Sequence, residues 1–192
     1  MSLKRIVGGG IILLLLIGVL SGCGKTKADI SDNNNTGQIS SSQSDSDTSG
    51  IKKAGESSYD VPDGWEIAEE MSTDDKKFYV EEGKSSVRQP DNFSVEYRTN
   101  RYDAADHEAF RDAIVQQLGL QAAQRDATLE SSGHTTDEGD VYYKFTLDYG
   151  EGVATQFYIV GEQKYCLVYA TDFSGESIAA DAALAVTKSF RW

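Results

Sequence analysis

Residues 157–170 read FYIVGEQKYCLVYA, and this stretch decides the fold. Phe157–Val160 and Tyr165–Ala170 are short apolar runs, and Gly161–Lys164 between them is typical of a hairpin loop. Each run is apolar on both faces, whereas a strand with one solvated face alternates apolar and polar residues. The pattern therefore predicts two neighbouring strands in the middle of a sheet, with a further layer packed over each face.

More amphipathic strands are predicted on either side of this hairpin. Val141–Tyr149 alternates apolar and polar residues over a long row, and Phe93–Arg98 does the same over a shorter one. Lys77–Val80 is a further candidate, and Val61–Ile67 is typical of a turn that leads into a short strand. Most of the elements predicted from Val61 onward are therefore strands.

A first helix is predicted from about Ala104 to Leu118. Asp103 is its candidate N-cap, and Gly119 suits the left-handed position that follows a helix. The apolar side chains repeat every four residues, which places them on one face of the helix. They are Phe110, Ile114 and Leu118.

A second helix is predicted from about Glu176 to Ser189, with Ser174 as a candidate cap. Its inward stripe is rich in alanine, which would allow a close approach to a sheet. The predicted stripe is Ile178, Ala182, Ala185 and Val186. The fold class predicted from these elements is α+β, an antiparallel β-sheet flanked by two α-helices.

The N-terminus carries the pattern of a lipoprotein signal. Lys4 and Arg5 precede the apolar run Ile11–Leu20, and Leu20-Ser21-Gly22-Cys23 resembles a bacterial lipobox. The resemblance implies cleavage before Cys23 and a diacylglyceryl group on its thiol. One alternative is an ordinary membrane span, but it needs about 20 apolar residues. The other is a plain secretory signal peptide in which the cysteine occurs by chance. We therefore expect residues 1–22 to be a signal peptide and Cys23 to hold the mature chain on the extracytoplasmic face of the cell membrane.

Composition divides the remainder into a linker and one folded domain. Residues 23–58 are rich in Ser, Asn and Asp and poor in large apolar residues, so we expect the lipidated Cys23 to be followed by a disordered tether. Residues 59–192 have a globular composition and the length of a single domain. Within them 26 acidic residues outnumber 12 basic ones, which argues against binding to nucleic acid. We therefore expect the partner to be a protein of the cell envelope and not a nucleic acid.

Three segments carry the resemblance to a known family. They are the turn Val61-Pro62-Asp63-Gly64-Trp65, the hairpin Phe157–Ala170 and the closing Ala185-Val186-Thr187-Lys188-Ser189-Phe190. Together with the element order they resemble the PsbP/Mog1 family over residues 59–192. The resemblance implies an antiparallel sheet with helices packed on it. It implies no shared catalytic residue, and by analogy it favours a binding or assembly role.

Catalytic and metal-binding patterns are weak. Residues 45–56 match an EF-hand loop by spacing, but serines precede them and Lys52-Lys53 interrupt them, so chance in an Asp/Ser-rich linker is the better interpretation. His107 and His134 lack a partner at catalytic or metal-ligand spacing, and we expect His134 in a loop. Cys166 lies in an apolar run and is expected to be a buried, inert thiol. No metal and no cofactor are expected.

One strand offers a candidate binding surface. Opposite Tyr143 and Phe145, the row Tyr142, Lys144 and Thr146 mixes aromatic, charged and hydroxyl side chains. Such a mixture is typical of partner surfaces if the face is uncovered, and ordinary sheet packing is the alternative. We therefore expect a membrane-anchored, non-catalytic binding or accessory module. The alternative is a hydrolase-like enzyme of the cell envelope, whose site is assembled from distant residues.

Overall fold

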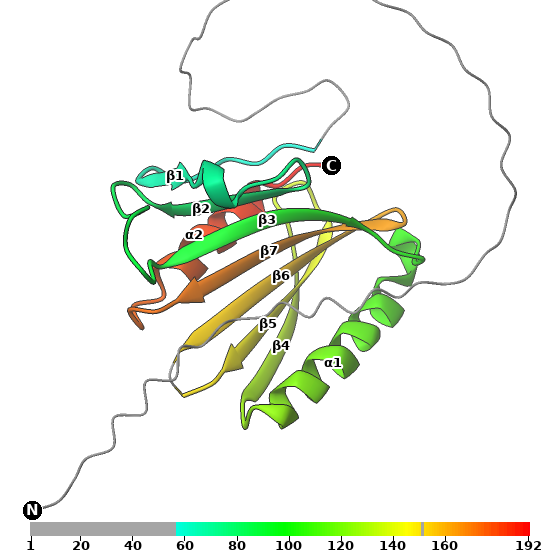
Figure 1. Ribbon diagram of the computed structural model, residues 1–192. Coiled ribbons are helices and arrows are strands. Elements are labelled where there is room, and N and C mark those ends of the chain that lie inside the picture. The colour runs from blue at the N-terminus through cyan, green and yellow to red at the C-terminus, as the bar shows by residue number, and fades with distance from the viewer. Residues whose placement is uncertain (1–56, 151) are drawn as a thin grey trace, which may run out of the picture. The chain divides into compact units, whose positions relative to one another are not determined.

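The computed structural model describes residues 57–150 and 152–192. The lipobox, Cys23, residues 24–56 of the expected tether and the 45–56 pattern lie outside the described residues. The described part forms a seven-stranded antiparallel sheet in the order β1-β2-β3-β7-β6-β5-β4 (Figure 1). The strands are β1 Trp65–Ile67, β2 Lys76–Glu81, β3 Asn92–Thr99, β4 Thr128–Thr135, β5 Val141–Asp148, β6 Val153–Gly161 and β7 Lys164–Asp172. The helices are α1 His107–Gln124 and α2 Ile178–Ser189, with short 3-10 turns at Glu69–Met71 and Ala104–Asp106.

The predicted central hairpin is confirmed. β6 and β7 pair antiparallel along their whole length, with Phe157 opposite Val168, and Gly161 and Lys164 form the last pair before the turn. Gln163 in the turn has a φ of 52°, the left-handed conformation that hairpin turns require. β7 pairs with β3 and β6 with β5, so the apolar pair lies inside the sheet.

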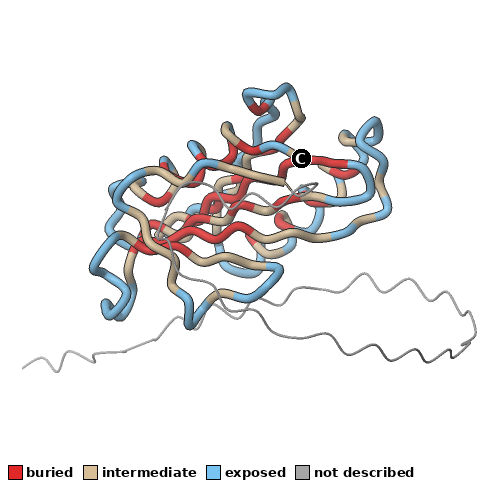
Figure 2. The backbone as a smooth tube through the Cα atoms, turned by 90° about the horizontal axis from the view of Figure 1, so that it is seen from above, coloured by how far each residue is buried: buried red, intermediate tan, exposed pale blue. Residues whose placement is uncertain are grey.

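The two helices cover opposite faces of the sheet. Alanines and Val186 of α2 pack on Phe93, Phe157 and Val168, which point to one face. Phe110, Ile114, Leu118 and Ala122 of α1 pack against the side chains that alternate strand residues send to the other face, namely Tyr143, Phe145, Leu147, Tyr158 and Val160. Figure 2 shows the buried residues concentrated along the strands and the exposed residues in the loops. The predicted α+β class, an antiparallel sheet flanked by two helices, is therefore confirmed.

The predicted end of the first helix is wrong. α1 continues through Gly119 to Gln124, because Ala122 extends the four-residue apolar series and is buried. The left-handed residue after the helix is Asp126, with a φ of 54°. Asp103 occupies the N-cap position of the 3-10 turn Ala104–Asp106, which leads directly into α1, but its side chain makes no capping hydrogen bond.

The second helix lies where expected, but its cap and part of its stripe differ. Asp172 at the end of β7 caps α2: its Oδ1 and Oδ2 accept the N–H groups of Ala179 at 2.7 Å and Ala180 at 3.2 Å. Ser174 instead contacts Asp91. Ala185 is exposed, whereas Ala179, Ala183 and Thr187 join Ala182 and Val186 on the buried face. Burial raises the pKa of the Asp172 carboxyl group and is the largest of the effects on this pKa.

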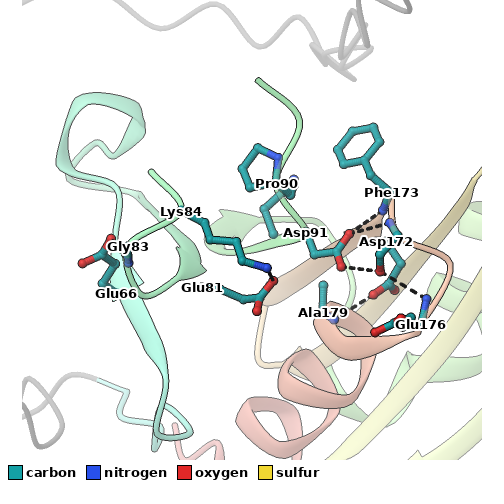
Figure 3. A network of polar contacts seen from close by, with 12 residues as sticks. Glu66, Glu81, Gly83, Lys84, Pro90, Asp91, Asp172, Phe173, Glu176 and Ala179 are labelled. Atoms are coloured by element: carbon teal, nitrogen blue, oxygen red, sulfur yellow. Dashed lines mark hydrogen bonds and ion pairs between the residues drawn. The ribbon is translucent and has the colours of Figure 1, made fainter. Parts of the chain in front are cut away.

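A buried carboxylate ties together two loops at one end of the sheet (Figure 3). Asp91 precedes β3, and its Oδ1 accepts the N–H groups of Phe173 at 2.6 Å and Ser174 at 2.9 Å. Its Oδ2 accepts the Ser174 hydroxyl at 2.5 Å. Asp91 is 5% exposed, so these contacts replace its lost hydration. The loop between β7 and α2 is therefore held to the start of β3.

The two ends of the described fold lie side by side. Ser58 and Arg191 form an antiparallel bridge, with backbone hydrogen bonds of 2.8 Å in both directions. The Trp192 indole donates to the carbonyl of Val160 at 3.1 Å. The first and last described segments are therefore held together by backbone hydrogen bonds.

In the described part of the chain, no helix combines the length and the apolar character needed to cross a membrane.

Candidate functional site

The predicted row on β5 lies on the face of the sheet that α2 covers only in part. Tyr142 is 3% exposed, and its ring packs edge-on against Phe157 with centroids 6.2 Å apart. Lys144 and Thr146 are half-buried and reach the surface. The three residues share one face, as the alternation indicates, but only Lys144 and Thr146 present atoms to a ligand.

Strand β4 completes this surface. Ser132 lies opposite Lys144, and Glu130 lies opposite Thr146, so all four side chains project from the same face. They border an open hollow of about 130 Å³, to which Ser131 also contributes. We call the surface of Glu130, Ser132, Lys144 and Thr146 the β4–β5 ledge. Its chemistry is one cation, one carboxylate and two hydroxyl groups.

Lys144 is the chemically distinctive residue of the ledge. It makes no ion pair within residues 57–150 and 152–192, although the domain is strongly acidic. Glu130 is its diagonal neighbour across the strand pair. A half-buried ammonium group beside hydroxyls can bind a carboxylate, a carbonyl oxygen or another acceptor of a partner. The hollow is smaller than the 300–1,000 Å³ typical of small-molecule pockets, which favours contact with a larger partner.

Ser132 of the ledge also forms a hydrogen bond with a histidine of the same strand. The hydroxyl of Ser132 and Nε2 of His134 are 2.8 Å apart, and the His134 ring stacks on Tyr142 with centroids 5.3 Å apart. Burial, followed by the negative charge of Asp137, raises the pKa of Tyr142. His134 lies on strand β4, where it pairs with Tyr142, so its expected placement in a loop is wrong. Both Ser132 and His134 are exposed.

The other histidine belongs to a different environment. Nδ1 of His107, at the start of α1, lies 2.7 Å from the hydroxyl of Tyr143. The Arg111 guanidinium lies over the same tyrosine ring, 5.7 Å from its centroid. Tyr143 belongs to the face covered by α1, whereas Tyr142 belongs to the face covered by α2. The structure therefore does not bring His107 and His134 into one site.

A second open hollow lies where the β5–β6 turn meets the loop after β7. Its volume is about 270 Å³, and Asp148, Gly150, Gly152, Val153, Asp172, Phe173, Ser174 and Gly175 line it. Asp172 caps α2, and the hydroxyl of Ser174 is bound to Asp91. Asp148 accepts the N–H of Gly150 at 2.7 Å. The polar groups of this hollow therefore stabilise the loops that form it.

Metal and thiol chemistry find little support in the described part. No three His, Cys, Asp or Glu residues of residues 57–150 and 152–192 gather as metal ligands would. Cys166 is fully buried, as predicted, and burial raises the pKa of its thiol. A buried neutral thiol is a poor nucleophile, because the thiolate is the reactive form.

Sequence reasoning found Lys144 and Thr146 but missed β4, and with it Glu130 and Ser132. β4 lacks apolar alternation, because only Leu129 among its residues is even half-buried. One signal was present: residues two apart on a strand share a face. Ser132 and His134 have that spacing, and it would have placed them together once the segment was taken as a strand.

Comparison with known proteins finds solved structures that are similar at low sequence identity. No known protein family and no curated protein matches the sequence. Among solved structures, the chain is similar to cyanobacterial PsbP (CyanoP) from Synechocystis at 15% identity, over 70% of this chain and 85% of that one, with a TM-score of 0.42. It is similar to a mutant of the protein Mog1 at 13% identity, over 74% and 94% of the two chains, with a TM-score of 0.43.

A protein from Bacteroides thetaiotaomicron is also similar, at 13% identity, over 70% of this chain and 44% of that one, with a TM-score of 0.37. Solved structures of PsbP and Mog1 are therefore among those to which this chain is similar. The likeness concerns the arrangement of strands and helices alone.

Proposed function

We propose that this chain is a membrane-anchored extracytoplasmic lipoprotein, whose folded domain is a non-catalytic binding or accessory module for a protein of the cell envelope. The anchor rests on the lipobox pattern that ends at Cys23. The binding role rests on the β4–β5 ledge, where Lys144 makes no ion pair in the described part of the chain. A cation left unpaired on an acidic domain is available to a partner.

The attachment is tested by Cys23→Ala in the full-length chain. Acylation of Cys23 would add two lipid chains, and two chains give stable anchoring where one gives only reversible binding. The variant should therefore lose its partition into detergent and its incorporation of radiolabelled palmitate. A variant that partitions and is labelled like the wild type would refute the lipoprotein assignment.

The binding role is tested by site-specific crosslinking on intact cells. A photoreactive amino acid replaces Thr146 on the ledge in one strain, and Gln116 on the exposed side of α1 in a matched control strain. The Thr146 strain should give a defined crosslinked species that the control strain lacks, and Lys144→Glu should reduce its yield. Equal products from both positions, or no effect of Lys144→Glu, would show that the ledge is not the binding surface.

The hydrogen bond between Ser132 and His134 favours the second candidate, a hydrolase-like enzyme. A histidine 2.8 Å from a serine hydroxyl can act as its general base. In a triad, a third group orients that base, and within the described residues no side chain other than Ser132 hydrogen-bonds to His134. A fluorophosphonate probe distinguishes the candidates: an enzyme would be labelled at Ser132 and lose the label in His134→Ala, whereas a binding module would remain unlabelled.

A further inference from the structure

The two edges of the sheet differ in length and regularity. β1, at one edge, has three residues. β4, at the other, has eight, and it pairs with β5 without interruption from Thr128 opposite Asp148 to Thr135 opposite Val141. The regular register excludes a β-bulge along this strand. β4 is therefore a long and straight edge.

Helix α1 packs on the face of β4 that carries Leu129, but the strand itself lacks the proline, lysine and bulge that usually block an edge strand. Folded proteins blunt such edges with proline, lysine, bulges or a covering segment. Thr128–Thr135 contains no proline and no lysine, and Glu130 is its only Asp, Glu, Lys or Arg residue. Within the described residues, no backbone group of β4 bonds to any segment other than β5. The outward N–H and C=O groups of β4 are thus available for pairing.

The surroundings of this edge are acidic. Asp126 lies just before β4, Asp148 lies beside its first residue, and Asp137 follows its last residues. None of these three aspartates, and not Glu130 either, forms an ion pair within the described part of the chain. Lys144 and Arg125 are the nearby cations, and the Arg125 guanidinium lies over the Tyr149 ring. An added strand would therefore meet a negative field along most of its length.

We propose that β4 accepts an extended, lysine- or arginine-rich segment of the partner as an eighth strand. The inference rests on the proposed binding function and specifies its geometry. Main-chain hydrogen bonds to an exposed edge supply affinity in such complexes, and alternate side chains supply specificity. Every second side chain of the added strand would project beside Glu130 and Ser132, so that its cations meet Glu130, while Lys144 lies one strand further from the edge, on β5, and remains available to acceptor groups elsewhere on the partner. A second copy of this chain fits less well, because both domains carry the same excess of acidic residues.

The experiment uses the full-length chain in detergent and three synthetic octapeptides. The first is acetylated and amidated Thr-Lys-Val-Lys-Thr-Lys-Val-Thr. The second has proline at its fifth position and the same charge, and the third has glutamate in place of each lysine. Fluorescence anisotropy gives the affinities, and amide hydrogen exchange locates the contact. The first peptide should bind at least tenfold more tightly than either of the others, and it should slow exchange in residues 128–135 but not in residues 65–67.

Two variants separate strand pairing from general charge attraction. Ser132→Lys blunts the edge, and Gln116→Lys makes the same change of charge on the exposed side of α1. The first should weaken binding of the lysine peptide about tenfold, and the second less than twofold. Equal effects of the two variants, or equal binding of the proline peptide, would overturn strand addition.

The remaining outcomes also decide the question. Protection of β4 that appears without peptide and grows with protein concentration would mean that a second copy occupies the edge, which overturns the proposal. Crosslinking from Thr146 on cells, together with failure of the peptide to bind β4, would overturn the strand-addition geometry and leave the binding module standing. Failure of both experiments would overturn both proposals.

Discussion

Replacement of Asp91 by asparagine should destabilise the fold by about 2 kcal/mol. The Asp91 carboxylate accepts three hydrogen bonds, from the N–H groups of Phe173 and Ser174 and from the Ser174 hydroxyl. Each hydrogen bond to a charged acceptor contributes about 1.5–3 kcal/mol, which sets an upper limit of several kcal/mol. Asparagine keeps one carbonyl oxygen, and Phe173 is 43% exposed, so water can replace part of what is lost. The loss should therefore lie well below that limit.

The free energy of unfolding is measured by urea denaturation at neutral pH, with Asp74→Asn as the matched control. Asp74 is exposed, so its replacement removes the same charge from a solvated position. For a domain of this size, a loss of 2 kcal/mol corresponds to a fall of about 8 °C in Tm. A double-mutant cycle with Ser174→Ala should give a coupling energy of about 1 kcal/mol for the Asp91–Ser174 contact.

The reasoning would be refuted if Asp91→Asn were no more destabilising than Asp74→Asn. It would also be refuted if the cycle gave no coupling between Asp91 and Ser174. Either result would mean that the hydrogen bonds of Asp91 add nothing to the free energy of unfolding. The contacts drawn in Figure 3 would then not hold the β7–α2 loop to β3.

Four further changes have directions fixed by the structure. Gly119→Ala should raise the unfolding free energy by about 0.5–1 kcal/mol, because α1 continues through this position and nothing lies within 4 Å of an added Cβ. Gly161→Ala should lower it by about 1–3 kcal/mol in the same urea titration, because the new Cβ would lie 2.7 Å from Cε2 of Trp192. Burial raises the pKa of Asp172 above its value of 3.8 in the unfolded chain, so its contribution to stability is full below that value and is lost as the pH rises through the raised pKa. The stability of the wild type relative to Asp172→Asn should therefore decrease as the pH rises above 3.8, and a constant difference would contradict this sign. Cys166 should react with Ellman's reagent only at the rate of unfolding, because its thiol is fully buried, and rapid labelling of the native protein would contradict this burial.

The sequence predicts the centre of the sheet well because burial on both faces leaves a strong pattern. Phe157–Val160 and Tyr165–Ala170 are apolar throughout, and a position inside a covered sheet buries both of their faces. β4 leaves no such pattern, since an edge strand with exposed side chains is built from polar residues. The end of α1 was misplaced for a related reason: glycine at position 119 suggests a cap, but buried Ala122 extends the helix by another turn.

The candidate site was predictable only in the half that lies on β5. Alternation placed Lys144 and Thr146 on one face, but the hollow depends on Glu130 and Ser132, which β4 brings opposite them. The helix cap was out of reach for another reason. Asp172 lies seven residues before Ala179, so the cap arises from the path of the loop and not from the residues next to the helix.

The order of strands in space constrains the order in which the chain can fold during synthesis. β4, β5, β6 and β7 follow one another as hairpins, so each can pair as soon as it emerges. The first three strands also form hairpins, and their strand pairing with the rest of the sheet is that of β3 with β7, for example Asn92 with Thr171. The β7-facing edge of β3 must therefore stay open until β7 has been synthesised. Any factor that protects this protein on its way to its final location would have to shield that waiting strand.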